Sequence, residues 1–328
     1  MWQTQRMCQM DGFEVYHLQF DLQASSPIDL PLQKGSALRG ALYAALRRHY
    51  CAAAPEDDPT HSALCPVCRL LATESQQASR GRDVPRPLAV KPPLDGRRRY
   101  EPGEVFCFGV AVVGSSVGLF PYLALALPMM GREGVGRRLD ENGGARGQFS
   151  LQAIAAYNPL TGARQTLMNA AREIVALPAL PVTWAQAEQA AADLPAGEVT
   201  LDFLTPTRIV DGGQLVHRPH FRPLFQRLLE GLLSLAETFG GGRPDLDARA
   251  LVDAAGAVRL VRDGTRWLDL HSGSRRLGRS TPIGGFVGKA TYAGDLAPFL
   301  PWLLLGQSVH VGKSAVKGNG WYQIVARR

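Results

Sequence analysis

Three cysteines in the first quarter of the chain have a spacing that is typical of metal ligands. Cys51, Cys65 and Cys68 form the pattern C-x13-C-x2-C, and the segment Cys-Pro-Val-Cys resembles a zinc knuckle. His61 or His49 is available as a fourth ligand. The pattern indicates a structural zinc ion that holds together an otherwise irregular loop. The alternatives are reduced thiols, or the remnant of such a site.

Histidines are the second set of residues with a chemical use, because their pKa lies near neutrality and suits proton transfer. Metal-independent cleavage of RNA needs a base, an acid, and cations that offset the charge on the phosphorane. Among the seven histidines, His49 stands out because it ends a helical pattern beside Arg48 and Tyr50. A histidine there also complements the helix dipole, or binds zinc. Three others compete for a role in proton transfer: His217, His220 and His310.

The charge of the chain indicates an anionic partner. It has 36 Lys and Arg against 29 Asp and Glu, a formal net charge of +7, and most of the cations are Arg. Arg presents a planar fork that binds phosphate and stacks on bases, so this balance favours a nucleic-acid partner. A GC-rich genome favours Arg as well. Three Arg clusters are expected in loops, where they would contact phosphates: residues 97–99, 137–138 and 275–279.

Length and hydropathy exclude several classes of protein. With 328 residues, 45% of them apolar, the chain can bury a core and is long enough for about two domains. Its longest apolar stretch begins at Leu119, contains two prolines and is too short to span a bilayer. The first residues lack a signal-peptide pattern and the number of cysteines is odd, so we expect a cytoplasmic protein without a membrane partner. Gly-Lys-Ser at 312–314 is not a nucleotide-binding loop, because Gln307 replaces the glycine that such a loop requires.

The first half of the chain is expected to alternate between strands and helices. Residues 13–21 alternate in polarity like a half-buried strand. Residues 36–51 have the apolar spacing of a helix, with Ser36 as its cap and cations in its last turn. Residues 52–100 are predicted to be irregular. Four further segments follow: a strand from Glu104, a helix from Phe120, a Gly- and Arg-rich loop over 131–147, and a strand over 148–158.

The second half repeats the same order after a Pro- and Ala-rich boundary over residues 177–197. Its predicted segments are a strand from Glu198, a basic turn over 208–222, an amphipathic helix over 223–241, an Arg-rich loop, a glycine-punctuated strand over 282–294, a short helix near 298–306 and a hairpin over 308–325. Two successive strand-helix-strand-strand-helix-strand units predict an α+β protein with two split βαβ domains. We place them at residues 1–190, with a Cys-containing insertion near 51–100, and at residues 197–328.

Glycines and lysines gather in the last segment of the chain. Gly312, Gly318 and Gly320 would let the backbone turn tightly and expose its N–H groups, while Lys313 and Lys317 add positive charge. This combination suits a close approach by an RNA backbone. A plain type I′ hairpin turn would need the same glycines, but not both lysines.

Three blocks of the sequence resemble the CRISPR-associated endoribonucleases of the RAMP superfamily, which cut precursor CRISPR RNA within its repeats. They are residues 30–51 with the core KGSALRG, residues 147–162 together with 201–209, and the glycine-rich block over residues 282–324. The resemblance implies two tandem ferredoxin-like domains of the RNA-recognition (RRM-like) type. It also implies that RNA is bound along the cleft and the C-terminal glycine-rich loop.

The resemblance implies roles for individual residues as well. The family commonly places its catalytic histidine at or just after the first helix, so His49 would be the general base or acid. Supporting groups would be Tyr43 or Tyr50, and Lys34 or Arg39. If His49 binds zinc instead, it is not the catalyst. The residues expected to bind RNA are Arg39, Arg208, His217, His220, Arg275, Arg276, His310, Gly312, Lys313, Lys317, Gly318 and Gly320.

The implied function is a metal-independent endoribonuclease that releases guide RNA with 5′-hydroxyl and 2′,3′-cyclic phosphate ends. It would need no cofactor for catalysis, and its partners would be CRISPR repeat RNA, guide RNA and other CRISPR effector subunits. Two alternatives stay open. One is a non-catalytic RAMP subunit that binds guide RNA as a scaffold or cap, and the other is a zinc-stabilised RNA-binding module outside CRISPR immunity.

Overall fold

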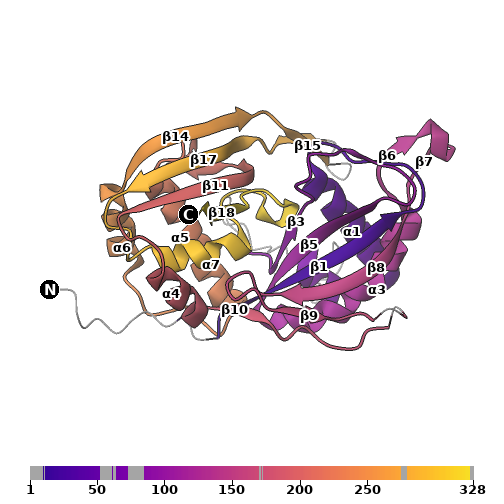
Figure 1. Ribbon diagram of the computed structural model, residues 1–328, viewed down its shortest axis with the longest axis horizontal. Helices are drawn as coiled ribbons and strands as arrows, with labels where there is room; N and C mark the ends of the chain where they lie inside the picture. Colours follow the sequence, from indigo (N-terminus) through magenta and orange to yellow (C-terminus); the bar gives the residue numbers. More distant parts are fainter. Residues whose placement is uncertain are drawn as a thin grey trace.

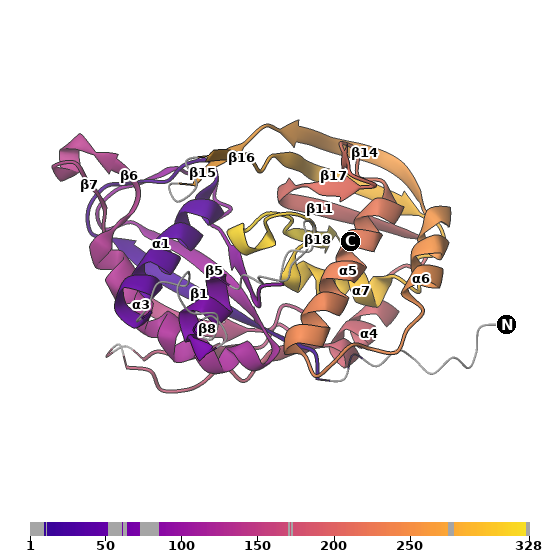
Figure 2. The same ribbon diagram turned by 180° about the vertical axis from the view of Figure 1, so that it is seen from behind.

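Two antiparallel sheets lie side by side, and each buries one face under helices (Figure 1). The computed structural model describes residues 10, 12–51, 61, 64–72, 85–169, 171, 173–274 and 279–325. Seen from the opposite side, helices of both halves stand in front of their sheets (Figure 2).

The first sheet is built around a long central strand, as the period-2 pattern near the N-terminus predicted. This strand, β1 (Glu14–Ala24), pairs antiparallel with β5 on one side and β8 on the other. Leu18, Phe20 and Leu22 are fully buried, so one face of β1 enters the core. The remaining strands of the sheet are β3 (Leu88–Lys91), β5 (Val105–Val113), β8 (Phe149–Tyr157), β9 (Arg164–Thr166) and β10 (Pro181–Thr183).

Helix α1 (Lys34–Tyr50) confirms the first predicted helix and carries the expected cations in its last turn. Its buried stripe, with Leu38, Leu42 and Leu46, packs into the core of the first sheet. The predicted cap was wrong. Gln33 occupies the N-cap position without a side-chain hydrogen bond, and Ser36 lies inside the first turn. The helix starts earlier because Lys34 and Gly35 are themselves buried in helical conformation.

The apolar stretch from Leu119 forms helix α3 (Phe120–Glu133), which packs against α1 and β8. Together with the preceding 3-10 turn it gives one segment, Gly114–Glu133, that is long and apolar enough to cross a membrane, and half of its apolar window is buried. Phe120, Leu123 and Leu127 lie in the core of the first sheet. This burial accounts for the apolar character of the segment.

Two segments that were predicted to be irregular contain short strands. The Gly- and Arg-rich loop is a hairpin of β6 (Val135–Leu139) and β7 (Ala145–Gly147). The region over 52–100 contributes strand β3 and a two-residue strand, β4 (Arg99–Tyr100), which pairs with β2 (Ile28–Asp29). Segments this short carry too little hydrophobic periodicity to be predicted from their own sequence.

The second sheet has the order β14-β17-β11-β18, and three of its four strands follow predicted segments. They are β11 (Glu198–Thr207), β17 (Gly285–Ala293) and β18 (Tyr322–Val325). The amphipathic helix is confirmed as α5 (Phe221–Phe239), and the short apolar helix as α7 (Leu300–Val309). Both pack their leucines and aromatic rings against the inner face of this sheet.

The edge strand β14 (Arg259–Leu268) was missed, because its Arg-rich sequence suggested a loop. Five other elements that the sequence did not predict surround the second sheet: the hairpin β12 (Ile209–Asp211) and β13 (Gln214–Val216), helix α6 (Ala248–Ala254), and the hairpin β15 (His271–Ser274) and β16 (Arg279–Pro282).

The passage between the two halves is ordered. After β10, which pairs with β1, the chain forms helix α4 (Trp184–Ala192). Thr183 caps this helix and Gln186 completes a capping box. Trp184 packs on Trp302 of α7, with 4.5 Å between the ring centroids. The boundary segment therefore joins the first sheet to the helical layer of the second, and the exact domain limits stay a prediction.

Candidate nucleic-acid interface

The glycine-rich segment, residues 311–321, leaves α7 and docks on the first half of the molecule. Its 3-10 turn (Ala315–Lys317) contacts β3 and the start of α1. A Cβ added at Gly35 would collide with the carbonyl oxygen of Lys317, and one at Gly318 would lie 2.9 Å from the carbonyl oxygen of Val90. Gly318 also has a φ of 87°, which favours glycine. Glycine is therefore needed at this contact on both sides.

The predicted C-terminal hairpin was wrong. Helix α7 continues to Val309 and ends at His310, which has a φ of 67° and is only 4% exposed. The segment then returns to β18, held by a hydrogen bond from the Val311 N–H to the Gly320 carbonyl (2.9 Å). Because the residues before His310 are helical, strand alternation does not apply to it. Its side chain is buried and stacks on Trp321, with 5.9 Å between the ring centroids.

Three cations from separate segments gather where this segment meets α1. Burial, with the nearby guanidinium groups of Arg39 and Arg86, lowers the pKa of Lys317. Arg39 lies over the Tyr43 ring, 4.9 Å from its centroid, and donates to the carbonyl of Leu71 (2.6 Å). The charges that shift this pKa are all positive, so a phosphate placed here would relieve their repulsion. Arg86 carries no sequence signal and was not predicted.

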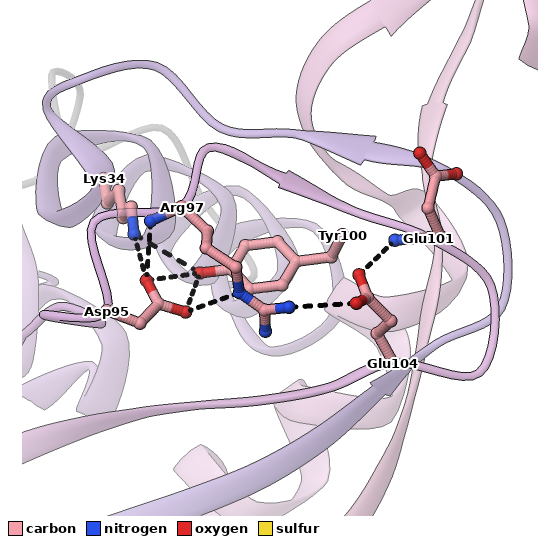
Figure 3. Close-up of polar contacts among 6 residues, drawn as sticks. All are labelled: Lys34, Asp95, Arg97, Tyr100, Glu101 and Glu104. Carbon is pink, nitrogen blue, oxygen red and sulfur yellow. Dashed lines mark hydrogen bonds and ion pairs between the residues drawn. The ribbon is translucent and has the colours of Figure 1, made fainter.

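Lys34, at the start of α1, is held in an internal network rather than offered to a ligand (Figure 3). Its Nζ lies 2.6 Å from Asp95 Oδ1 and 3.3 Å from the Tyr100 hydroxyl. Burial raises the pKa of Asp95, but hydrogen bonds from Lys34 and Tyr100 outweigh it and hold this pKa below its ordinary value. Arg97 joins the network through Asp95 and Glu104. The network fixes the start of α1 to the loop that follows β3.

Two of the predicted Arg clusters are also paired internally. Arg98 and Arg137 both reach Asp29, at 3.6 Å and 3.4 Å. Arg99 forms ion pairs with Glu101 and with Glu141, the latter at 2.8 Å. A cation that already has a carboxylate partner must break that pair to bind a phosphate. These clusters are thus weaker candidates for RNA contact than their sequence suggested.

His49 lies at the opposite end of α1. Its Nε2 is 3.1 Å from Glu133 Oε1, and Arg48 reaches the same carboxylate oxygen at 2.9 Å. The side chain of His49 is 36% exposed. Since a helix rises 1.5 Å per residue, His49 is about 22 Å along the axis from Lys34. The predicted catalytic residues are therefore separated in the structure. His49 lies at the end of α1, whereas Lys34 and Arg39 lie nearer the glycine-rich segment.

Tyr50 completes the site at the end of α1. Its ring lies 6.2 Å from that of His49 and packs edge-on against Tyr122 of α3 at 5.7 Å. Tyr43 instead lies under Arg39, on the side of the glycine-rich segment. Tyr50 therefore lies beside His49, whereas Tyr43 lies beside Arg39 near the middle of the helix.

The Cys and His residues next to this site form the predicted metal-ligand set. The ligand atoms of Cys51, His61, Cys65 and Cys68 all lie within 4.8 Å of one another. Three thiols and one imidazole are a donor set that zinc prefers in tetrahedral structural sites. Burial and the neighbouring thiols raise the pKa of Cys68 to about 12, and a bound cation would favour its thiolate. His61 fills the fourth position, which leaves His49 outside the set.

The other residues predicted to bind RNA are spread over the second half. The guanidinium of Arg208 donates to the Gly284 carbonyl (3.2 Å), and its own carbonyl accepts from the Lys313 N–H (3.0 Å). His217 packs on Trp267, and His220 precedes α5, far along the chain from the glycine-rich segment. Lys313 is exposed. Arg275 and Arg276 lie outside the described residues.

A buried basic trio was not predicted as a unit. It consists of His17, Lys91 and His310, and lies where α7 and the glycine-rich segment meet the first sheet. Their exposed fractions are 0%, 6% and 4%. The Lys91 ammonium lies over the rings of Tyr157 and Trp321, at 5.8 Å and 5.0 Å from their centroids. Burial lowers the pKa of Lys91 to about 7, and burial together with Lys91 lowers that of His310 to about 3.

Family comparisons agree with this architecture. A model of the AF_1859_N family, described as an N-terminal domain, matches residues 13–180, about half of the chain. A model described as CRISPR-associated endoribonuclease Cas6 matches residues 201–322. The second half of the chain therefore matches the CRISPR-associated Cas6 endoribonucleases. The resemblance seen in the sequence is confirmed, and the match supports endonucleolytic processing of CRISPR RNA as the activity.

Solved Cas6 structures share its fold. Cas6 from Thermus thermophilus is 15% identical, with a TM-score of 0.57 over 95% of this chain and 99% of that one. A Cas6 product complex is 17% identical, with a TM-score of 0.57 over 95% and 100% of the two chains. A partial Cas6-RT-Cas1–Cas2 complex is 15% identical, with a TM-score of 0.59 over 98% of this chain and 47% of that one. No curated protein sequence matches the chain. The α+β class with tandem ferredoxin-like domains is confirmed.

Proposed function

We propose that this Cas6 endoribonuclease cuts the repeats of precursor CRISPR RNA without a metal ion in the reaction. The 2′-hydroxyl at the cut site attacks the adjacent phosphorus, and the bond from phosphorus to the 5′-oxygen breaks. The products carry a 2′,3′-cyclic phosphate and a 5′-hydroxyl. The observation that carries this proposal is the exposed His49–Glu133 pair at the end of α1.

In this proposal the carboxylate of Glu133 determines which ring nitrogen of His49 carries the proton. With Nε2–H donated to Glu133 Oε1, the Nδ1 lone pair is free to accept the 2′-hydroxyl proton. Glu133 then stabilises the imidazolium that forms. Arg48, on the same carboxylate and 66% exposed, supplies a cation beside the reacting phosphate. Tyr50 supports the ring of His49 from its own side of the helix end.

The basic cluster of Arg39, Arg86 and Lys317 would hold the RNA backbone at the other end of α1. Because Arg39 lies about 15 Å along the axis of α1 from His49, one phosphate cannot touch both sites. The repeat must therefore run along α1, with several nucleotides between the cut and the glycine-rich segment. The exposed side chain of Lys313 would add a further phosphate contact. The glycine-rich segment does not offer its backbone as the sequence predicted, because most of its N–H groups donate to oxygens of the protein itself, among them those of Val311, Lys313 and Gly320.

A zinc ion held by Cys51, His61, Cys65 and Cys68 would have a structural role. When bound it would cross-link the insertion to the residue that follows Tyr50. This fixes the end of α1 and with it His49 and Tyr50. The four ligands leave no open position, so the chemistry of the cut rests on the side chains of the chain.

We assign RNA and other CRISPR proteins as its partners. This follows from its family and from the names of similar structures, one a product complex and another a Cas6-RT-Cas1–Cas2 complex. The runner-up, a RAMP subunit that binds guide RNA without cutting it, becomes one outcome of the following test.

The test uses repeat RNA from the host's own array and measures both binding and cleavage. Wild-type protein should cut once, and a single 2′-deoxy substitution at the cut site should abolish the cut without weakening binding. His49→Ala should lower the cleavage rate by about 10²–10⁴-fold, and Glu133→Gln by roughly tenfold, at unchanged RNA affinity. The matched control for Glu133→Gln is Glu237→Gln, which changes an exposed carboxylate of α5 that pairs with Arg243 and should leave cleavage normal.

The chemical groups at the ends of the cleaved RNA identify the reaction. This measurement needs no chelator, which would also remove a structural zinc ion. A 5′-hydroxyl accepts phosphate from polynucleotide kinase directly, and mass spectrometry identifies the cyclic phosphate. Ends with a 5′-phosphate would indicate metal-dependent hydrolysis and contradict the proposal. Tight binding with no cut would favour the scaffold subunit.

A further inference from the structure

The helix-free face of the second sheet carries a row of cations at its outer edge, the β14 row. It consists of Arg259, Arg262 and Arg266 on β14 and Lys289 on β17, and all four are exposed. Figure 1 shows β14 as the edge strand at the top of this sheet. In the order β14-β17-β11-β18 it is farthest from β18, at roughly 14 Å for three strand spacings. The row is thus separate from the glycine-rich segment.

The pairing register places all four side chains on the face opposite the core. Arg262 is level with Thr291, and Arg266 with Val287, while the alternate residues Ala290 and Tyr292 of β17 are buried against the helices. Arg259 is level with Ala293, on the same side. Because successive side chains of a strand alternate between faces, the row points away from α5 and α7.

The spacing of the row suits a nucleic-acid backbone. Lys289 is level with Gly264, between Arg262 and Arg266, and Gly264 has no side chain that would cover it. The cations therefore follow one another at intervals of two strand residues, about 6.7 Å. This interval is of the same order as the separation of successive phosphates in an extended single strand.

The charges of the row are not neutralised by the protein. Within the described part of the chain, none of the four forms an ion pair, whereas Arg97, Arg99 and Arg218 all do. Asp263, which neighbours Arg262, faces the other side and binds Arg218 and Thr265. The acid nearest the row on its own face is Asp202, across from Lys289 on β11. Three unpaired guanidinium groups remain for a ligand.

The side chains next to these cations indicate what kind of ligand the surface can bind. By the register, the neighbours of the row on this face are Glu198, Thr200, Asp202, Val287, Thr291 and Ala293, and none has an aromatic ring on which a base could stack. Such a surface contacts phosphates and does not distinguish base sequences. A protein that cuts within repeats also meets the RNA that flanks them.

We propose that the β14 row binds the phosphate backbone of single-stranded RNA that flanks the repeat, independently of its sequence. This inference rests on the proposed function for the presence of that RNA, but not on His49 or on cleavage. It adds a second RNA contact at the far edge of the second sheet, and lengthens the bound RNA beyond the repeat.

The test compares three RNAs by fluorescence anisotropy over a range of salt: the repeat alone, and the repeat with either of two unrelated single-stranded flanks. The variant is Arg259→Gln, Arg262→Gln and Arg266→Gln together. For flanked RNA, the slope of log K against log salt should become shallower by about 2, which corresponds to roughly 100-fold weaker binding at 0.1 M salt. Affinity for the repeat alone should not change, and both flanks should respond alike.

The matched control removes three cations from the helix-bearing side: Arg222→Gln, Arg243→Gln and Arg249→Gln. It should bind all three RNAs as the wild type does. An equal loss in the control would show that only net charge matters, and would overturn the proposal. So would an equal loss for the repeat alone. The single variant Arg262→Gln, with about a third of the slope change, guards against misfolding of the triple variant. Binding is read without cleavage, so an uncut repeat would contradict the proposed function and leave this result intact.

Discussion

Two glycines of α1, Gly35 and Gly40, have different surroundings. Gly35 lies against the carbonyl oxygen of Lys317, so a side chain there would push the glycine-rich segment off the helix. Gly40 has nothing within 4 Å of an added Cβ. The same change, glycine to alanine, therefore separates the docking of the segment from the stability of the helix itself.

We expect Gly35→Ala to destabilise the protein by about 1–3 kcal/mol, because the collision is with backbone, and to weaken repeat binding. Gly40→Ala should stabilise it by about 0.5–1 kcal/mol, because alanine favours an exposed helix position, and should leave RNA binding unchanged. Denaturant unfolding and RNA titration measure both. Equal effects of the two variants would show that the docking of Lys317 on Gly35 does not matter.

At the scale of elements, the end of α1 depends on the Cys and His ligand set. Cys51 follows directly after Tyr50, so whatever Cys51 binds also fixes the last turn of the helix. Glu133, at the end of α3, holds His49 from the other side. The two helix ends and the insertion thus form one unit around the proposed cut site.

We expect purified protein to contain one zinc ion per chain by atomic emission. Cys68→Ser or removal of the ion should lower the melting temperature by several degrees and slow cleavage, because the end of α1 is released. RNA binding by the glycine-rich segment should be affected less. Cys107→Ser is the control, since this exposed thiol on β5 is outside the ligand set. Full activity of metal-free protein would contradict this role.

At the scale of the whole molecule, three basic side chains are buried where α7 and the glycine-rich segment meet the first sheet, and among the described residues no carboxylate is buried with them. His17 on β1 bonds to Ser308 of α7 at 2.9 Å, and Lys91 of β3 lies against Trp321. His310 stacks on the same Trp321. All three groups cost free energy when protonated in this place, because burial disfavours their charged forms.

Stability should therefore rise with pH. Burial lowers the pKa of Lys91 from 10.5 to about 7, so between these values the unfolded chain binds a proton that the folded chain does not. Unfolding becomes harder by as much as a few kcal/mol over this range. His310, lowered from 6.5 to about 3, destabilises the fold further as pH falls below 6.5.

Lys91→Met should remove the rise in stability between pH 7 and 10, and should be more stable than the wild type at pH 7. Lys289→Met, at an exposed lysine, is the control and should keep the rise. Denaturant unfolding at several pH values measures it. A wild-type curve that is flat above pH 7 would show that Lys91 stays charged in the folded protein.

The sequence by itself determined the α+β class, the family and most of the long elements. The pattern of β1, the apolar stripe of α1 and the leucines of α5 each specify their own segment, because hydrophobic periodicity is local. The Cys and His ligands were also predicted, since their spacing in sequence reflects a short closed loop. The glycines and lysines near the C-terminus indicated an RNA-binding segment because they too lie close together in the sequence.

Only the tertiary structure decided which of these residues meet. It put His49 and Lys34 at opposite ends of one helix, gave the fourth zinc position to His61, and buried His310 beside Lys91. It paired the Arg clusters at 97–99 with carboxylates and left those of β14 unpaired. Charge pairing and burial depend on residues far apart in the chain, brought together by packing of the two sheets, and no local pattern records them.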